Sequence, residues 1–238
     1  SSDKVQLADF SELRRTGRFY IRIGQTRSCE FEISDAPYEN LLSDIRKTFY
    51  YSRCGSALHR IRAGKFRRKT CHIEPAILLS DKNILLDVSG GWHDAGDYSR
   101  CTVTAALSLA HLLYAFELFP TIFRDADGIS DMGRKCPAII EECQYELEWL
   151  LKMQDKDGGV YHKVSSMDYA DYVLPGEDDK RLYVFGKSAA ATTAFAAVMA
   201  LAARVFEPMG LRIMKKLRPA ALAAWIWLIN NPEEKPFV

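Results

Sequence analysis

The sequence lacks an uninterrupted apolar run long enough to cross a membrane. Its longest apolar stretches are Ala189–Ala203, which two threonines interrupt, and Ala220–Ile229, and neither reaches the ~18–20 residues of a spanning helix. Cysteine is also scarce, because six cysteines in 238 residues are too few for a disulfide scaffold. The first residues, Ser1–Lys4, include no initiator methionine and no charged and then apolar leader. We therefore expect no membrane partner, no visible signal peptide, and a processed or excised segment.

The composition is that of a folded chain with balanced charge. Hydrophobic residues make up 48% of the sequence and charged residues 26%, which is enough for one large domain or two small ones and excludes a disordered chain. The net charge of +1 conceals an asymmetry. Residues 1–70 carry 15 Lys/Arg against 8 Asp/Glu, whereas residues 71–238 carry 17 against 23. The net charge by itself indicates no polyanionic partner.

The first 34 residues predict β-structure. In the run Phe19–Ile23 alternate residues share one face of a strand, Gly24–Arg27 has the composition of a turn, and Glu30–Ile33 alternates again. One hairpin is only marginally stable by itself. We therefore predict that residues 1–34 are the edge of an incomplete β-module.

Helical periodicity dominates from residue 35 onward, and the predicted fold is mainly α. Two helices, at 103–119 and 188–206, are apolar almost all round and should be buried on every side, in the inner of two layers of helical hairpins. The long connectors 54–100 and 155–187 are the expected carriers of function. The predicted helices cover residues 36–53, 101–119, 136–154, 188–207 and 211–230. The third is amphipathic, with a predicted exposed face of Glu141, Glu142, Glu146, Glu148 and Lys152.

The stretch Asp87–Tyr98 is the most informative part of the sequence. It places two carboxylates, Asp94 and Asp97, in a glycine-rich loop directly before a predicted buried helix. The two can converge on one water molecule if the segment makes a single turn. Trp92 and Tyr98 offer flat faces to a sugar ring. The alternative is structural, with Asp97 capping the helix and Asp94 closing the turn.

The string Gly90-Gly91-Trp92-His93-Asp94-Ala95-Gly96-Asp97-Tyr98 resembles the aspartate motif of glycoside hydrolase family 9, the cellulase family with an (α/α)6 barrel. Phe49–Gly55 resembles the first barrel helix of that family, Tyr145–Gln154 a later helix, and Gly158–Val164 a cleft loop. The β-rich residues 1–34 resemble the last strands of the immunoglobulin-like module that precedes the barrel in one subgroup. The resemblance thus covers nearly the whole chain, with residues 35–238 as the N-terminal part of the barrel.

The resemblance implies inverting hydrolysis of β-1,4-glucosidic bonds in cellulose, cello-oligosaccharides or related β-glucans by a secreted enzyme. Its motif makes Asp97 the general base and Asp94 a residue that helps to hold the attacking water. The family's acid is a glutamate near the end of the barrel, so we expect it outside residues 1–238 and interpret Glu177 as a solvated loop acid. Half a barrel would expose apolar faces, so we expect a missing C-terminal half, a complementary chain or self-association to cover them.

Cys54, Cys71, His72 and His93 form a second constellation. Two cysteines and two histidines suit tetrahedral zinc, although the set lacks two closely spaced cysteines, and buried free thiols are the alternative. The immunoglobulin-bearing subgroup carries a structural zinc with ligands at matching positions. The resemblance therefore implies a closed, non-catalytic zinc site beside Asp94. The remaining cysteines are predicted to be free thiols: Cys29, Cys101, Cys136 and Cys143.

Two further features concern ligands. Tyr161 and His162 follow a predicted helix, and we expect them to line the substrate cleft, with packing inside the loop as the alternative. Family members also bind calcium, but its ligands cannot be placed in this sequence. Asp125–Gly128 is a turn that lacks the later ligands of a calcium loop.

Two other functions stay open. Residues 60–69 hold six basic side chains around Phe66 and could contact nucleic-acid phosphates and stack a base, although a solvated loop is the simpler interpretation. The second is a non-catalytic or inactive carbohydrate-binding fragment stabilised by zinc.

Overall fold

The computed structural model describes residues 4–5, 7–123 and 136–232. It divides the chain into two compact units, residues 1–45 and 46–238. The boundary falls inside helix α1 (Glu39–Ser52). The sequence places the boundary at residue 34, one residue after the last strand of the first unit ends at Ile33. That residues 1–34 belong to an immunoglobulin-like module stays a prediction.

The first unit contains two small antiparallel sheets. The predicted strand Phe19–Ile23 is divided in two, because Ile21 leaves the ladder to bond with Ser28: its N–H donates to Ser28 Oγ at 2.9 Å. The strands are β1 (Gly17–Phe19) paired with β4 (Phe31–Ile33), and β2 (Arg22–Ile23) paired with β3 (Thr26–Arg27).

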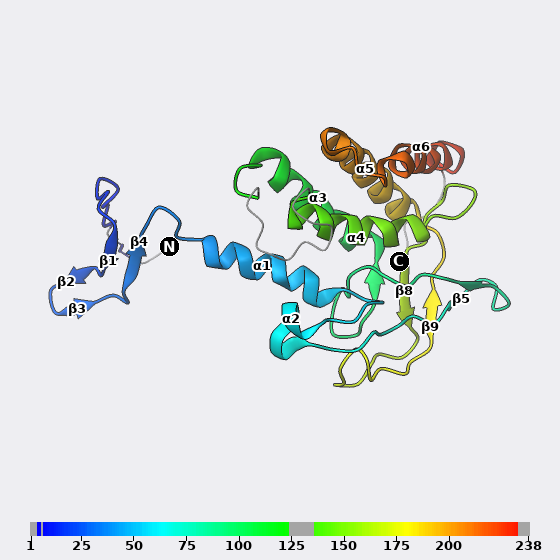
Figure 1. Ribbon diagram of the computed structural model, residues 1–238, viewed down its shortest axis with the longest axis horizontal. Helices are drawn as coiled ribbons and strands as arrows, with labels where there is room; N and C mark the ends of the chain where they lie inside the picture. Colours follow the sequence, from blue (N-terminus) through cyan, green and yellow to red (C-terminus); the bar gives the residue numbers. More distant parts are fainter. Residues whose placement is uncertain (1–3, 6, 124–135, 233–238) are drawn as a thin grey trace. The chain divides into compact units, whose positions relative to one another are not determined.

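The second unit is built on long helices that match the predicted ones to within a few residues. Helix α5 packs against both α3 and α6, and α3 also contacts α4. The Ser188 hydroxyl caps α5 by accepting a hydrogen bond from the Ala191 N–H at 3.1 Å. Figure 1 shows α3, α4, α5 and α6 gathered on one side of this unit. Their bounds are Thr102–Leu118, Ala138–Lys152, Ala189–Phe206 and Met214–Asn230.

The two long connectors form a five-stranded sheet that the sequence does not predict. Its order is β6-β5-β9-β8-β7, with β5 and β9 parallel and the other pairs antiparallel. Each strand is only two to four residues long, too short for alternation to be recognised in a sequence. The sheet joins the two connectors and ends directly at the start of α3. Its strands are β5 (Ala76–Leu78), β6 (Leu85–Leu86), β7 (Arg100–Cys101), β8 (Lys163–Ser166) and β9 (Leu182–Val184).

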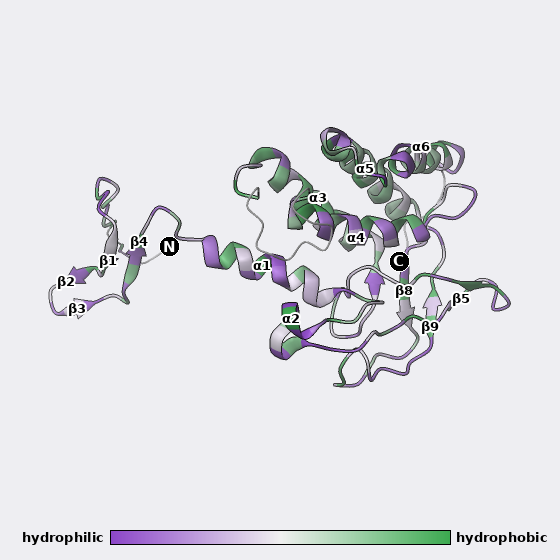
Figure 2. Cartoon of the chain, in the orientation of Figure 1, coloured by the Kyte–Doolittle hydropathy of each residue, from purple (hydrophilic) through white to green (hydrophobic). Residues whose placement is uncertain are grey.

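The prediction that two helices are buried on every side is wrong. Helix α3 leaves Leu107 59% and Leu118 66% exposed, because no further helix of the described chain covers that face. Helices α3 and α5 are nevertheless predominantly hydrophobic in Figure 2. Between α5 and α6 lies an apolar groove of about 530 Å3, with Leu222 and Trp225 on its α6 side. An apolar surface of this kind is typical of a face that packs against another element.

One described helix has the length and hydropathy of a membrane span. The segment Ala189–Met209 has the required length and mean hydropathy, although two threonines interrupt its apolar run. The expectation from the sequence differed because it rested on the length of uninterrupted apolar runs. The same segment is 56% buried inside the protein, and its packing against α3 and α6 is that of a core helix.

The exposed faces of α3 and α6 predict association in solution. Residues 1–238 alone should elute from a size-exclusion column as an oligomer or bind a hydrophobic dye, since Leu107, Leu118 and Trp225 lie uncovered. Replacing Trp225 with Gln should shift the elution toward the monomer. A monodisperse monomer with a cooperative thermal transition would contradict this expectation.

Candidate active-site loop and metal centre

The loop Asp87–Tyr98 rests on helix α4. The indole N–H of Trp149 donates to the Val88 carbonyl at 3.2 Å, and Arg100 Nη1 donates to the carbonyls of Val88 at 2.5 Å and Gly90 at 2.7 Å. Gly91 has φ +78°, and a Cβ there would lie 2.6 Å from the Trp149 ring. Only glycine therefore fits at this position, and the loop approaches α4 as closely as its backbone allows.

The two candidate catalytic aspartates lie on a single tight turn. The Tyr98 N–H donates to the Ala95 carbonyl at 3.1 Å, and the Asp94 N–H donates to the Ser99 carbonyl at 2.8 Å. Asp97 Oδ1 accepts hydrogen bonds from the Ser99 N–H at 3.2 Å and hydroxyl at 3.0 Å. Asp97 thus closes its own turn and does not cap α3, whose N-cap residue is Cys101. The carboxylate of Asp94 is exposed and that of Asp97 half-buried.

A cavity of about 190 Å3 adjoins this turn. Asp94, His93 and Trp92 line it from the loop, Phe49 from α1 and Thr104 from the first turn of α3. The cavity brings an exposed carboxylate, an aromatic wall and a hydroxyl together, which are the groups that a sugar ring needs. Asp97 is not among the lining residues.

Trp92 lines the cavity, and contacts with Phe49 and Glu142 hold its ring in place. It is only 7% exposed, and its ring lies 4.8 Å from that of Phe49. The indole N–H donates to Glu142 Oε1 at 2.8 Å, and Arg53 binds the same carboxylate with Nη2 at 2.8 Å from Oε2. Its expected contact with substrate stays a prediction.

Tyr98 is oriented toward the cysteine and histidine cluster. Its ring centroid lies 5.1 Å from His93 and 5.8 Å from His72, and its hydroxyl donates to the Val173 carbonyl. Burial raises its pKa, and the nearby carboxylate of Asp178 raises it further. Tyr98 therefore joins three segments of chain, and its expected contact with a sugar stays a prediction.

Tyr161 and His162 lie on the connector between α4 and β8. Tyr161 is 7% exposed, and burial raises its pKa. His162 Nδ1 lies 2.9 Å from Ser188 Oγ, and burial followed by the charge of Lys163 lowers its pKa. Both residues are packed within the connector, and their place in a substrate cleft stays a prediction.

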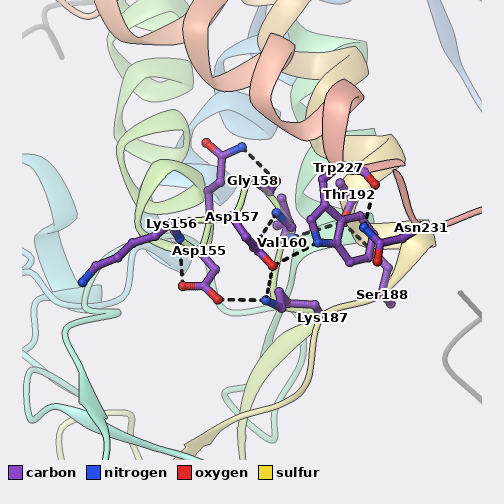
Figure 3. A network of polar contacts seen from close by, with 12 residues as sticks. Asp155, Lys156, Asp157, Gly158, Val160, Lys187, Ser188, Thr192, Trp227 and Asn231 are labelled. Carbon is purple, nitrogen blue, oxygen red and sulfur yellow. Dashed lines mark hydrogen bonds and ion pairs between the residues drawn. The ribbon is translucent and has the colours of Figure 1, made fainter. Parts of the chain in front are cut away.

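A charged network fixes the turn before Tyr161 (Figure 3). The sequence does not predict this network. Lys187 Nζ lies 2.9 Å from Asp155 Oδ2 and 2.7 Å from Asp157 Oδ2. The Trp227 indole N–H from α6 donates to the same Asp157 oxygen at 3.2 Å. A Cβ at Gly159 would lie 2.6 Å from the Trp227 ring, so the turn packs directly against α6. Only the run of aspartates and glycines hinted at a turn here, and nothing in the sequence pairs it with Lys187.

The four predicted metal ligands converge. One ligand atom from each of Cys54, Cys71, His72 and His93 lies within 4.8 Å of the others. The distance from His93 Nε2 to His72 Nδ1 is 3.3 Å, and that from His93 Nε2 to Cys71 Sγ is 3.8 Å. A tetrahedral zinc with Zn–N bonds of about 2.0–2.1 Å places two nitrogens about 3.3–3.4 Å apart. The donor set and its spacing therefore fit a closed tetrahedral metal site.

The electrostatics of the cluster favour a thiolate. Hydrogen bonds from Cys54, His72 and His93 lower the pKa of Cys71, and Arg68 Nη1 lies 3.0 Å from its Sγ. The hydrogen bond to Cys71 and burial raise the pKa of Cys54, and burial lowers that of His93. A thiolate beside a neutral imidazole is the form that binds a metal ion.

Backbone strain is concentrated at the same place. His72 (φ +51°) and Tyr98 (φ +58°) are the non-glycine residues with positive φ in the described part of the chain, and their rings touch. Such a conformation costs about 1–2 kcal/mol at each residue. The surrounding contacts must supply that free energy, and a bound metal would supply part of it.

The expected exposed face of α4 is wrong for three of its five residues. Glu141, Glu142 and Glu146 are 9%, 8% and 0% exposed, and Glu142 and Glu146 face the loop Asp87–Tyr98 instead of solvent. Neither oxygen of Glu146 forms a hydrogen bond within the described residues. Burial raises its pKa well above the ordinary value, against the opposing charge of Arg100.

The other predicted features have simple outcomes. All six cysteines are free, as expected for the four outside the cluster. The turn Asp125–Gly128 lies outside the described residues, so the structure says nothing of calcium there.

The basic segment 60–69 forms the short helix α2 (Arg60–Ala63) and a 3-10 turn rather than a loop, and Arg68 points into the cysteine and histidine cluster. Glu177 is exposed at the surface.

Comparison with known proteins identifies the family. The sequence model of Glycosyl hydrolase family 9 matches residues 38–236. The chain belongs to this family. It is 38% identical to a cellodextrinase of Butyrivibrio fibrisolvens over 240 residues, which cover 100% of this chain and 44% of the relative. The helices α1 and α3–α6 are thus part of an (α/α)6 barrel.

Solved structures of the family share the fold of this chain. A Zn-binding triple mutant of the family 9 endoglucanase J30 superposes with a TM-score of 0.90 at 35% identity, over 97% of this chain and 45% of that one. AaCel9A in complex with cellobiose-like isofagomine superposes with a TM-score of 0.91 at 34% identity, over 97% and 44%. The chain therefore spans under half the length of these relatives.

Glu146 predicts a specific pH dependence of stability. A carboxyl whose pKa is raised in the folded state stabilises the fold fully below its unfolded pKa of about 4.5, and this contribution is lost as the pH rises through the raised value. Glu146→Gln, which cannot ionise, should remove that loss, so its free energy of unfolding should exceed that of the wild type increasingly above pH 4.5, by up to about 1.4 kcal/mol per pH unit. Urea denaturation between pH 4 and pH 8 measures the difference. The control Glu148→Gln changes an exposed carboxylate of the same helix and should run parallel to the wild type, and the same parallel behaviour in Glu146→Gln would refute the assignment.

Proposed function

We propose that this chain is the base-bearing part of an inverting glycoside hydrolase that acts on β-1,4-linked glucans, such as cellulose, cello-oligosaccharides or related β-glucans. The observation that carries the proposal is the turn Asp94–Ser99, which holds Asp94 and Asp97 close together and places Asp94 in the wall of an aromatic-lined cavity, in a chain of Glycosyl hydrolase family 9. The named activities of the relatives, cellodextrinase and endoglucanase, support this substrate class.

Asp97 is the proposed general base. Its Oδ1 is fixed by two hydrogen bonds from Ser99, so the carboxylate has one orientation, while Oδ2 makes no hydrogen bond within the described residues. A water held between Asp94 and Asp97 would lose a proton to Asp97 Oδ2 as its oxygen attacks the anomeric carbon. The exposed Asp94 helps to hold that water.

The general acid comes from outside these residues. An inverting enzyme needs a protonated carboxyl on the opposite face of the sugar, about 6.5–9.5 Å from the base, to give its proton to the leaving oxygen. The chain spans under half the length of its relatives, and the family resemblance implies an acid glutamate in the later part of the barrel. Substrate walls at Trp92, Tyr98, Tyr161 and His162, and secretion of the whole protein, complete the proposal.

The metal centre has a structural part in this proposal. With Cys54, Cys71, His72 and His93 all as protein ligands, a zinc ion would have no open position for water or substrate. Bound there, zinc would supply a rigid junction between the connector 54–93 and the loop that carries Asp94. The metal would take no part in the catalytic steps, which belong to Asp97, Asp94 and the general acid.

The alternative functions receive less support. A non-catalytic carbohydrate binder does not require two carboxylates on one tight turn, and the relatives described above are named as hydrolases. A nucleic-acid surface over residues 60–69 loses Arg68, whose guanidinium binds Cys71 Sγ and the Ser56 carbonyl. Salt-dependent DNA binding would favour that function instead.

The proposed base predicts the effect of one conservative change. In the full-length protein that contains these residues, Asp97→Asn should lower kcat on a β-1,4-glucan by about 10²–10⁴-fold, because the water loses its proton acceptor while the shape of the turn is kept. Asp81→Asn, which changes an exposed carboxylate in the turn between β5 and β6, is the control and should keep most of the activity. Release of reducing ends measures both. Unchanged hydrolysis by Asp97→Asn would reject Asp97 as the base.

The metal proposal predicts a stoichiometry. After dialysis against metal-free buffer, elemental analysis should find close to one equivalent of zinc per chain, because the ligand atoms already stand at tetrahedral spacing. Replacing both Cys54 and Cys71 with Ser should abolish retention. Less than about half an equivalent in the unmodified protein would count against the site.

A further inference from the structure

The segment Met167–Arg181 joins β8 to β9 and is largely exposed. Tyr169 is 76% exposed and Tyr172 is fully exposed. The segment contributes none of the four ligands of the metal centre. A long exposed segment with few apolar contacts is ordered only as far as its anchoring contacts hold it.

Its anchoring contacts run to the metal centre and to Tyr98, which touches it. Asp178 Oδ2 lies 3.0 Å from His72 Nε2, and the two side chains are only 2% and 3% exposed. The Val173 carbonyl accepts a hydrogen bond from the Tyr98 hydroxyl. The backbone at Gly176 passes close to Lys69, two residues before Cys71, since a Cβ added at Gly176 would lie 3.8 Å from the Lys69 carbonyl oxygen.

The contact between Asp178 and His72 has the geometry of a ligand and its outer partner. His72 turns Nδ1 toward His93 Nε2 at 3.3 Å and Nε2 toward Asp178, so one ring nitrogen faces the centre and the other faces the carboxylate. A carboxylate at Nε2 holds the proton on that nitrogen and leaves the Nδ1 lone pair for a metal ion. Asp178 Oδ1 accepts the Lys180 N–H at 3.1 Å, so the carboxylate is itself held in place by its own turn.

The positive φ of His72 makes this support necessary. At φ +51° the backbone of His72 is in a conformation that a histidine seldom adopts, and it aims the ring into the cluster. A buried hydrogen bond to the far nitrogen fixes the ring against that strain. Among the described residues, Asp178 is the carboxylate that pairs with His72.

We infer that Asp178 is a positioning residue of the metal centre, and that a bound metal ion holds the segment Met167–Arg181 in place through the His72–Asp178 pair. The inference rests on the proposed metal site. It assigns to the centre a second task besides joining the connector 54–93 to the aspartate loop: ordering a segment that carries two exposed tyrosines beside that loop.

The test compares two neighbouring carboxylates. Asp178→Asn and Asp178→Ala remove the charged partner of His72, whereas Asp179→Asn changes the next residue, which is exposed. Zinc affinity is measured by competition with a chromogenic chelator, and order in the segment is measured by hydrogen exchange of peptides from residues 167–181. Both Asp178 variants should bind zinc about 10–100-fold more weakly than the wild type, with Asp178→Asn less affected than Asp178→Ala. Asp179→Asn should match the wild type.

Hydrogen exchange separates positioning from a merely structural contact. In the wild type, removal of zinc by a chelator should speed exchange in 167–181 although the segment holds no ligand, and zinc-loaded Asp178→Asn should already exchange fast there. Unchanged exchange after zinc removal, or equal zinc affinity of the Asp178 and Asp179 variants, would overturn the inference while leaving the metal site standing. A wild-type protein that binds no zinc would overturn the metal site and this inference together. The chelator experiment on the wild type decides the matter even if the Asp178 variants do not fold.

Discussion

Three stretches of chain outside the long helices meet at one point in this protein. There, one ligand atom from each of Cys54, Cys71, His72 and His93 lies within 4.8 Å of the others. The rest of the site depends on that convergence. The connector between α1 and the aspartate loop has only short strands, the short helix α2 and a 3-10 turn of its own, and the cluster closes it at both ends. Because His93 directly precedes Asp94, whatever fixes the cluster also fixes the start of the turn that carries Asp94 and Asp97. The paired strain at His72 and Tyr98 shows that the surrounding contacts impose this geometry against local backbone preference.

Contacts with helix α4 are the second constraint on the position of the loop Asp87–Tyr98. Trp149 of this helix binds a backbone carbonyl of the loop and Glu142 holds the Trp92 indole, while Arg100 of β7 binds the same carbonyl and a second one. Buried polar groups of this kind are costly unless they are paired, and here they specify one position for the loop rather than adding much net stability. Glu146 is an exception to this pairing, because it is buried beside the loop and its carboxyl oxygens make no hydrogen bond among the described residues. The loop is therefore held between a metal-ligand cluster on one side and a rigid helix on the other.

The sequence alone could predict the long helices and the aspartate turn, because each rests on a local pattern. The family resemblance led to the expectation that Cys54, Cys71, His72 and His93 lie together, which the structure confirms, and their binding of a metal stays a prediction. Helical periodicity placed α3 and α4 within two residues of their observed ends. It could not reveal which face of α4 is buried, because Glu142 and Glu146 look like surface residues until a loop distant in the chain packs over them. The five-stranded sheet could not be predicted either, because its strands are too short to show an alternation of apolar and polar residues. The pairs Lys187–Asp157 and His72–Asp178 join residues 30 and 106 positions apart, and no local pattern encodes such contacts.

The central claim is that the cysteines and histidines form a closed metal site that sets the geometry of the aspartate loop. X-ray absorption at the zinc edge of the zinc-loaded protein tests it most directly. The account predicts two sulfur ligands at about 2.3 Å and two nitrogen ligands at about 2.0–2.1 Å, with no water in the coordination shell. A spectrum with only oxygen and nitrogen ligands, or one with a bound water and a single sulfur, would contradict it.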